Sequence, residues 1–72
     1  DTSKMILSPM PGLVVTLDVI PGQLVRAGEA VCVVEAMKMQ NIIRAERDGT
    51  VKTVGAQAGD SVAADEVLVE FA

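Results

Sequence analysis

Histidine is absent from this sequence of 72 residues, and cysteine occurs only once, as Cys32. Without histidine the chain has no imidazole for general base catalysis, for a Ser-His-Asp triad or for zinc. Cys32 lies in the apolar run 30–34, which favours a buried small side chain over a nucleophile. Glu46 and Asp48 lie close together, but without further grouped carboxylates they indicate a solvated turn. We therefore expect no catalytic residue and no metal site, so the chain alone is expected to be non-catalytic.

Aromatic and basic residues are also scarce. Phe71 is the only aromatic residue, and ten acidic residues against six basic ones give a formal net charge of −4. Nucleic-acid binding needs a clustered basic surface or stacking platforms, so we expect no nucleic-acid partner. No apolar run approaches the length of a membrane span, and no basic-then-apolar leader opens the sequence, so we expect no membrane partner.

The length fits one small domain with a radius of gyration of roughly 11 Å. A chain of this size buries only about 60% of its unfolded surface, so its core has little to spare. The sequence begins with Asp1 rather than methionine. We expect residues 1–72 to be a single domain cut from a longer chain.

The second half of the sequence repeats the first at an offset of 37 positions. Identities recur at this offset without a gap, and chance agreement at that density is improbable. We therefore expect two units of one fold, with Gly22 and Gly59 in equivalent turns. The identical pairs include Gly12 with Gly49, Val14 with Val51, Thr16 with Thr53, Gly22 with Gly59, Val25 with Val62, Ala27 with Ala64 and Glu29 with Glu66.

Both units consist of short β-branched runs between Gly, Pro and Asp turn signals. This pattern indicates an all-β domain. Pro9 and Pro11 mark a break before the first long strand, because proline is poorly tolerated inside a ladder. The predicted strand-like segments are 13–20, 24–26, 30–34, 50–54, 61–62 and 67–71.

The stretch 34–46 gives conflicting signals. Its Glu, Ala, Met, Lys and Gln residues are good helix formers, so local propensity predicts a helix. The repeat argues otherwise, because residues 42–49 correspond to residues 5–12, where two prolines make a helix improbable. We therefore predict a strand at 40–45 and a β-hairpin whose connection is 36–39.

A two-residue turn at Met37 and Lys38 would lack the Asn-Gly residues that favour positive φ. Such a local cost is expected at a functional site. The repeat carries residue 1 onto residue 38, so the turn should lie at the opposite end of the domain from the chain termini. A tether would attach at one end and the lysine would project from the other.

An ordinary surface residue is the simplest interpretation of Lys38. In a continuous strand, Met37 and Met39 would point inward and the lysine into water. Lys4 and Lys52 fit that description without difficulty. Lys38 differs because it stands at the junction of the two units and has no useful charge partner. The chain has few other reactive side chains. An attachment point is therefore the better hypothesis.

The motif EAMKMQN at 35–41 strongly resembles the attachment site of biotin carboxyl carrier domains. In that family the lysine of an Ala-Met-Lys-Met tetrapeptide takes biotin in amide linkage. Further matches at SPMPG (8–12), GTV (49–51) and AGD (58–60) extend the resemblance over nearly the whole chain.

The resemblance implies a flattened β-barrel or sandwich of two four-stranded antiparallel sheets with pseudo-two-fold symmetry and the lysine hairpin at one end. It implies covalent biotin on Lys38 in a single biotinyl carrier domain. We expect partners to recognise Glu35, Ala36, Met37 and Met39 around it.

The resemblance also implies partners and a mechanism. A biotin protein ligase would attach biotin, which would be carboxylated with ATP and bicarbonate in a biotin carboxylase site. The carboxyl group would then pass to an acceptor in a carboxyltransferase site. The domain would thus be a segment of a biotin-dependent carboxylase, cytoplasmic if bacterial and in the mitochondrial matrix if eukaryotic.

Alternatives remain at this stage. A lipoyl domain also carries its cofactor on a hairpin lysine, but its typical turn reads Asp-Lys-Ala, and an unmodified structural module could keep the same fold. Gln40 and Asn41 resemble the propionyl-CoA carboxylase α subunit, whereas pyruvate carboxylase more often continues with Glu-Thr. The short connection 20–23 leaves no room for the protruding loop of many bacterial acetyl-CoA carboxylase carriers. Methylcrotonyl-CoA carboxylase and biotin-dependent decarboxylases stay open.

Overall fold

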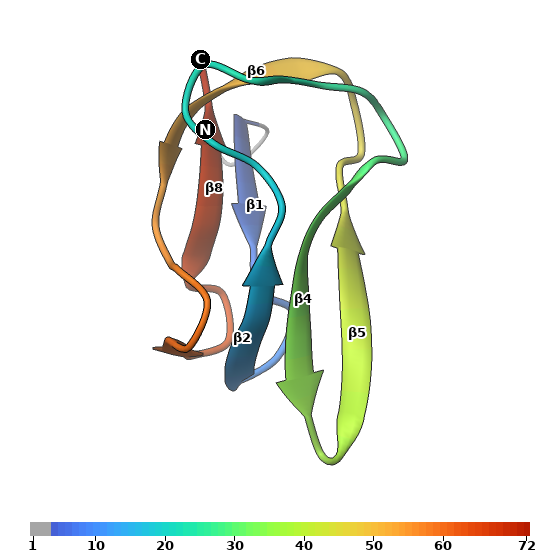
Figure 1. Ribbon diagram of the computed structural model, residues 1–72, viewed down its shortest axis with the longest axis vertical. Helices are drawn as coiled ribbons and strands as arrows, with labels where there is room; N and C mark the ends of the chain where they lie inside the picture. Colours follow the sequence, from blue (N-terminus) through green and yellow to red (C-terminus); the bar gives the residue numbers. More distant parts are fainter. Residues whose placement is uncertain (1–3) are drawn as a thin grey trace.

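The turn signals of the sequence divide the chain into eight short strands. A computed structural model describes residues 4–72, and the account below concerns these residues (Figure 1). The prediction of an all-β domain is confirmed. The strands are β1 (Met5–Leu7), β2 (Gly12–Leu17), β3 (Leu24–Val25), β4 (Ala30–Ala36), β5 (Met39–Arg44), β6 (Gly49–Val54), β7 (Ser61–Val62) and β8 (Val67–Phe71).

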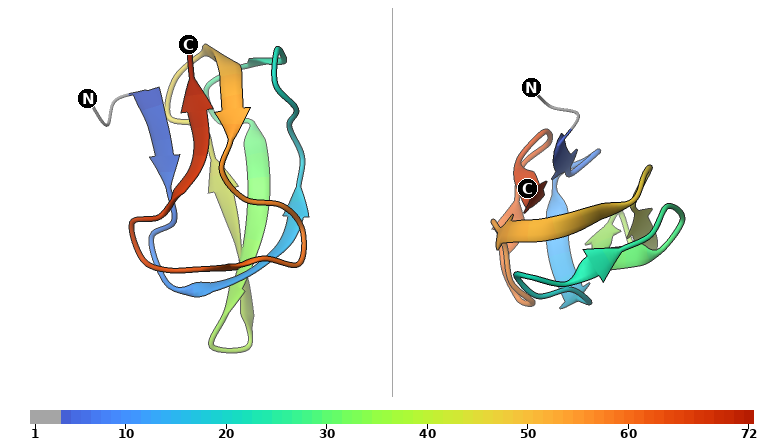
Figure 2. Two further views of the ribbon diagram at one scale, coloured as in Figure 1. Left: turned by 90° about the vertical axis from the view of Figure 1, so that its left-hand side faces the viewer. Right: turned by 90° about the horizontal axis from the view of Figure 1, so that it is seen from above.

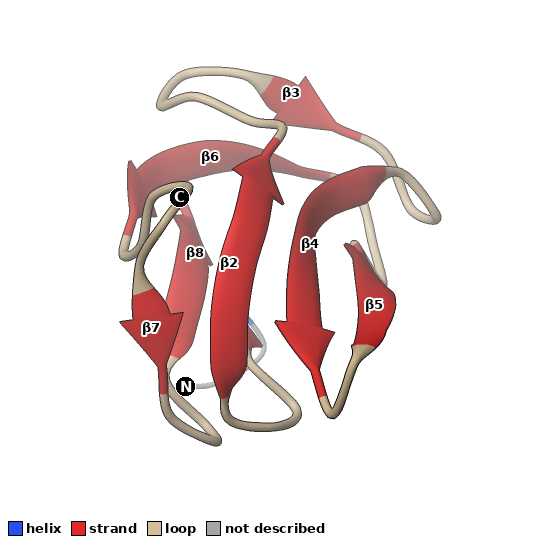
Figure 3. Cartoon of the chain, turned by 60° about the horizontal axis from the view of Figure 1, so that its bottom comes forward, coloured by secondary structure: helices blue, strands red, loops and turns tan. Residues whose placement is uncertain are grey.

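The strands form two four-stranded antiparallel sheets, as expected. One sheet has the order β1-β8-β6-β3 and the other has the order β5-β4-β2-β7. The repeat relates the two sheets strand by strand. In the order given, β1, β8, β6 and β3 of the first sheet correspond to β5, β4, β2 and β7 of the second. Each sheet therefore contains two strands from either unit, and the two sheets face each other across the core (Figures 2 and 3).

The repeat also holds at the level of single hydrogen bonds. The N–H of Val14 donates to the carbonyl oxygen of Asp60 at 2.8 Å, and the N–H of Gly59 donates to that of Val14 at 2.8 Å. The positions 37 residues away make the same pair of bonds, so each unit is fastened to the other twice. The second pair joins Val51 N–H to Gln23 O (2.9 Å) and Gly22 N–H to Val51 O (2.8 Å).

Gly22 and Gly59 occupy equivalent turns, as the repeat predicts. Their φ angles are 89° and 96°, in the left-handed region where residues with a Cβ are strained. A Cβ added at either position would meet no atom within 4 Å. Glycine is therefore needed here for its backbone conformation and not for space.

The core between the sheets is built mainly from valine. Fully buried members include Val14, Val31, Val34 and Val51, and Phe71 closes one side. Small β-branched side chains suit two closely facing sheets because few of their rotamers are lost on packing.

Cys32 is part of this core, which confirms the prediction of a buried small side chain. Its exposed fraction is 0%. Burial, reinforced by the negative charge of Asp18, raises the pKa of its thiol from 9.0 to about 11. The thiol therefore stays protonated and unreactive near neutral pH.

Two strand ends differ from the predicted ones by more than one residue. The long run 13–20 leaves the ladder after Leu17, where the N–H of Asp18 donates to the carbonyl oxygen of Val31 at 2.8 Å. Beyond this bond Val19 stays buried, whereas Ile20 is 68% exposed. β4 in turn continues beyond the predicted end at residue 34, because pairing with β5 carries it to the tip of the hairpin.

The elongated shape separates the two ends of the domain. The principal extents are 31 × 21 × 18 Å. Figure 1 shows the C-terminus and the start of β1 at one end and the β4–β5 turn at the other, as the repeat predicts. Within residues 4–72 no helix has the length and apolarity to cross a membrane, and no cluster of three or more potential ligand side chains forms a metal site.

The equivalence of the two glycine turns can be tested by mutation. Gly22→Ala and Gly59→Ala are each expected to lower the free energy of unfolding by about 1–2 kcal/mol, because both force alanine into the left-handed region. Denaturant unfolding of the two variants measures the losses. Unequal losses, with one variant as stable as the parent chain, would contradict the equivalence.

Candidate functional site

The β4–β5 hairpin carries the motif that the sequence singled out. The two strands pair over six residue pairs, of which Ala36 with Met39 is the last. Met37 and Lys38 alone form the loop, with φ angles of 53° and 65°. Positive φ at both positions defines a type I′ turn. The predicted hairpin is thus confirmed, and the helix favoured by local propensity does not form.

Tertiary pairing explains why a helix-forming sequence becomes a hairpin. β4 is a central strand, paired on one side with β2 and on the other with β5. Its residues Val31, Cys32 and Val34 are fully buried. A helix at 34–46 would give up this ladder and this burial, which outweigh propensity differences of less than about 1 kcal/mol per residue.

The side chains of the turn all point into solvent. Met37 is 94% exposed and Met39 is 65% exposed, and Lys38 between them is exposed as well. The inward methionines expected for an ordinary strand lysine are therefore not found. Two exposed methionines thus flank Lys38 at the tip of the hairpin.

The other candidate recognition residues lie at the same end of the hairpin. Glu35 is exposed and faces Gln40 across the ladder, and Ala36 is half-buried beside Met39. The hairpin thus brings Glu35, Ala36 and both methionines around Lys38.

Asn41 links the base of the hairpin to the loop before β2, a contact that sequence reasoning did not find. Its Nδ2 lies 3.4 Å from the carbonyl oxygens of Val34 and Met39 and 3.5 Å from Sδ of Met10. No spacing rule joins positions 10 and 41, because they meet only through the fold.

The segment SPMPG at 8–12 shapes the loop before β2. The hydroxyl of the buried Ser8 donates to the carbonyl oxygen of Met10 at 2.6 Å, which fixes the loop. Gly12 then passes so close to β4 that a Cβ would lie 2.5 Å from the carbonyl oxygen of Glu35. This contact braces the hairpin just below its tip.

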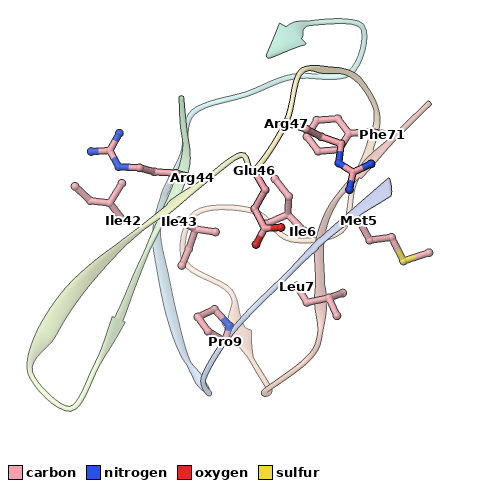
Figure 4. A pocket seen from close by; sticks show the side chains of 10 residues that line it. All are labelled: Met5, Ile6, Leu7, Pro9, Ile42, Ile43, Arg44, Glu46, Arg47 and Phe71. Atoms are coloured by element: carbon pink, nitrogen blue, oxygen red, sulfur yellow. The ribbon is translucent and has the colours of Figure 1, made fainter. Parts of the chain in front are cut away.

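A groove of about 430 Å³ lies between the free edges of β1 and β5 (Figure 4). Ile6 and Leu7 form one wall, Ile42 and Ile43 form the other, and Phe71 lies deep in it. Lys38 and its neighbouring methionines do not line this groove. The turn is thus exposed and separate from this groove.

The amine of Lys38 meets the chemical requirement for a covalent bond to a ligand. A primary amine at the tip of a two-residue turn can form an amide with a carboxyl group without disturbing the core. The residues present therefore fit a covalently attached cofactor.

Comparison with known proteins identifies the family. The family described as "Biotin-requiring enzyme" matches residues 4–71. The propionyl-CoA carboxylase alpha chain of Ruegeria pomeroyi is 58% identical over 71 residues, which cover 99% of this chain and 10% of that protein. The mitochondrial propionyl-CoA carboxylase alpha chain of Homo sapiens is 54% identical over the same shares of both chains. The chain spans about a tenth of the length of these relatives.

Solved structures show the same architecture. Urea carboxylase from Kluyveromyces lactis matches with a TM-score of 0.85 and 26% identity over 94% of this chain and 6% of that one. The lipoyl domain of the 2-oxoglutarate dehydrogenase complex from Azotobacter vinelandii matches with a TM-score of 0.75 and 29% identity, over 86% of this chain and 78% of that one.

The chain therefore belongs to the family of biotin-requiring enzymes. Within it, the chain is a biotin carrier domain.

The strained turn can be tested without touching the lysine. Met37→Asn is expected to raise the free energy of unfolding by about 0.5–1 kcal/mol, because asparagine adopts positive φ at lower cost. Met37→Ala is the control, since alanine keeps the strain and the side chain it replaces is almost fully exposed. Equal denaturant midpoints for these two variants would show that the turn stores no strain at this position.

Proposed function

We propose that Lys38 carries biotin through an amide between its Nζ and the cofactor carboxyl group. The observation that supports this most is the turn itself. It places one lysine, between two exposed methionines, at the end of the domain opposite the C-terminus.

The chain contributes position and contact surface to the reaction. When bound, biotin supplies a ureido nitrogen that takes up a carboxyl group at one enzyme site and releases it at another. Amide formation removes the positive charge of Lys38, so the arm becomes neutral and enters a protein site at a lower desolvation cost. The six-pair ladder holds the base of the arm rigid, while the flexible Met37 and Met39 adapt to several partner surfaces.

The partners follow from this role. A biotin protein ligase attaches the cofactor, and a biotin carboxylase and a carboxyltransferase use it in turn. Contacts by Glu35, Ala36, Met37 and Met39 orient Lys38 in each of these sites. Residues 1–72 act as one carrier domain within a longer chain, in the cytoplasm of a bacterium or the mitochondrial matrix of a eukaryote.

Propionyl-CoA is the acceptor that the relatives favour. The two relatives described above are both propionyl-CoA carboxylase alpha chains, with 58% and 54% identity. Human mitochondrial pyruvate carboxylase is 33% identical over 99% of this chain. The higher identity supports propionyl-CoA over pyruvate.

Lipoate is the second candidate for the cofactor attached to Lys38. The fold is shared with a lipoyl domain, so the architecture alone does not separate the two cofactors. The flanking residues do favour one of them, because Met37 and Met39 stand where a typical lipoyl turn has Asp and Ala.

Coexpression with each ligase tests both the cofactor and its site. With a biotin protein ligase, intact-mass spectrometry is expected to show one biotinyl adduct, and Lys38→Ala is expected to abolish it. The variant should lose less than about 0.5 kcal/mol of stability, because an exposed turn lysine contributes little to folding.

Lys4→Ala and Lys52→Ala are the matched controls, and both should keep the adduct. Labelling of the Lys38→Ala chain would refute the site. A lipoyl adduct together with no biotinyl adduct would refute the cofactor.

Identifying the acceptor of the carboxyl group requires an assay of the full-length protein that contains this domain. Incorporation of labelled bicarbonate is expected to be fastest with propionyl-CoA among propionyl-, acetyl- and methylcrotonyl-CoA and pyruvate. A faster reaction with any of the other three would reassign the substrate.

A further inference from the structure

The four methionines form two pairs with different access to solvent. Met37 is 94% exposed and Met39 is 65% exposed. Met5 and Met10 are half-buried, and Sδ of Met10 lies 3.5 Å from the amide nitrogen of Asn41. The two thioethers beside Lys38 are therefore much more open to a dissolved oxidant than the other two.

The remaining sulfur is protected. Cys32 is fully buried, and its raised pKa keeps it as the thiol, whereas peroxide reacts with the thiolate. The sequence contains no tryptophan, tyrosine or histidine that could compete for an oxidant. Oxidation of this chain is thus directed to methionine, and among the methionines to the turn.

We propose that Met37 and Met39 form a peroxide-sensitive modification site, and that their conversion to methionine sulfoxide slows the loading of biotin onto Lys38. This inference rests on the proposed function of Lys38.

The chemistry is a two-electron oxygen transfer. A lone pair of the thioether sulfur attacks one oxygen of hydrogen peroxide, an S–O bond forms, the O–O bond breaks and the second oxygen leaves as water. Sulfur is oxidised and peroxide is reduced. Methionine sulfoxide reductases reverse the change with two thiols, which become a disulfide while the sulfoxide oxygen leaves as water.

The effect on loading follows from polarity. An unoxidised methionine offers a partner an apolar, adaptable contact. A sulfoxide at the same place carries a strong hydrogen-bond acceptor, and a ligase that covers the turn would bury this oxygen without a donor. Oxidation therefore weakens the encounter while Nζ of Lys38 stays intact.

The first experiment maps the site on the unmodified 72-residue chain, because biotin has a thioether of its own. The chain is treated with limiting hydrogen peroxide, catalase stops the reaction, and peptide mass spectrometry locates the added oxygen. Sulfoxide is expected at Met37 and Met39 at least about fivefold faster than at Met5 and Met10. Equal or faster oxidation of Met5, Met10 or Cys32 would overturn the proposed site.

The second experiment measures the initial rate of loading by a biotin protein ligase that never meets peroxide. Oxidation is expected to slow loading by about tenfold, and methionine sulfoxide reductases with a dithiol are expected to restore it. The Met37→Leu/Met39→Leu variant should keep its own starting rate after peroxide, because leucine is not oxidised. The Met5→Leu/Met10→Leu variant should remain sensitive.

The two proposals fail in different ways. An untreated chain that takes no biotin on Lys38 would refute the proposed function. An untreated chain that loads normally, with an oxidised chain that loads equally fast, would refute the inference about the methionines alone.

Discussion

The hydrogen bonds that cross between the two halves of the chain are the constraint on which the rest of the structure depends. Each sheet takes two strands from either unit, so neither unit can complete a sheet by itself. Val14 and Val51 sit at equivalent crossings and bond to the turn of the opposite unit. A chain too short for a large core gains its order from this interlocking, because it satisfies the backbone of both units at once.

The position and the character of the hairpin tip follow from the interlocking. Because β4 is pinned between β2 and β5, the ladder runs up to Ala36 and leaves only Met37 and Lys38 for the loop. Both residues adopt a backbone conformation that neither prefers, and the ladder supplies the energy that holds them. The domain thus has a rigid platform with an exposed amine at the tip of its hairpin, and its chemistry is left to the attached group and to the enzymes it meets.

Much of the fold and of the candidate site could be predicted from the sequence, because it follows from local patterns or from the repeat. The all-β class, the equivalent turns and the hairpin at Lys38 rest on pattern and on the repeat, which correctly overruled helix propensity at 34–46. The two four-stranded sheets were expected from the family resemblance, and β1 was not among the strands predicted from the residues. The end of β2 at Leu17 was missed, because the apolar run continues to Ile20 and the sequence alone does not show where the pairing with β4 stops.

Contacts between distant segments could not be predicted. The link between Met10 and Asn41 and the groove between β1 and β5 arise only when both sheets are in place. Asp48 was expected in a solvated turn, and it is indeed exposed. Its Oδ1 nevertheless accepts a hydrogen bond from the N–H of Ala27 at 2.7 Å, which the spacing does not reveal.

The place of β8 has a consequence for the order of events in the cell. β8 lies between β1 and β6, so the strand of this domain that is synthesised after the other seven described strands is an inner strand of its sheet. While it is still inside the ribosomal tunnel, β1 has no neighbour and the face opposite β4 is open. The rigid base beneath Lys38 is therefore completed only after Phe71 has emerged. A chain truncated before β8 would therefore leave β1 unpaired and β6 without one of its neighbours, and the platform beneath Lys38 would lack its second sheet.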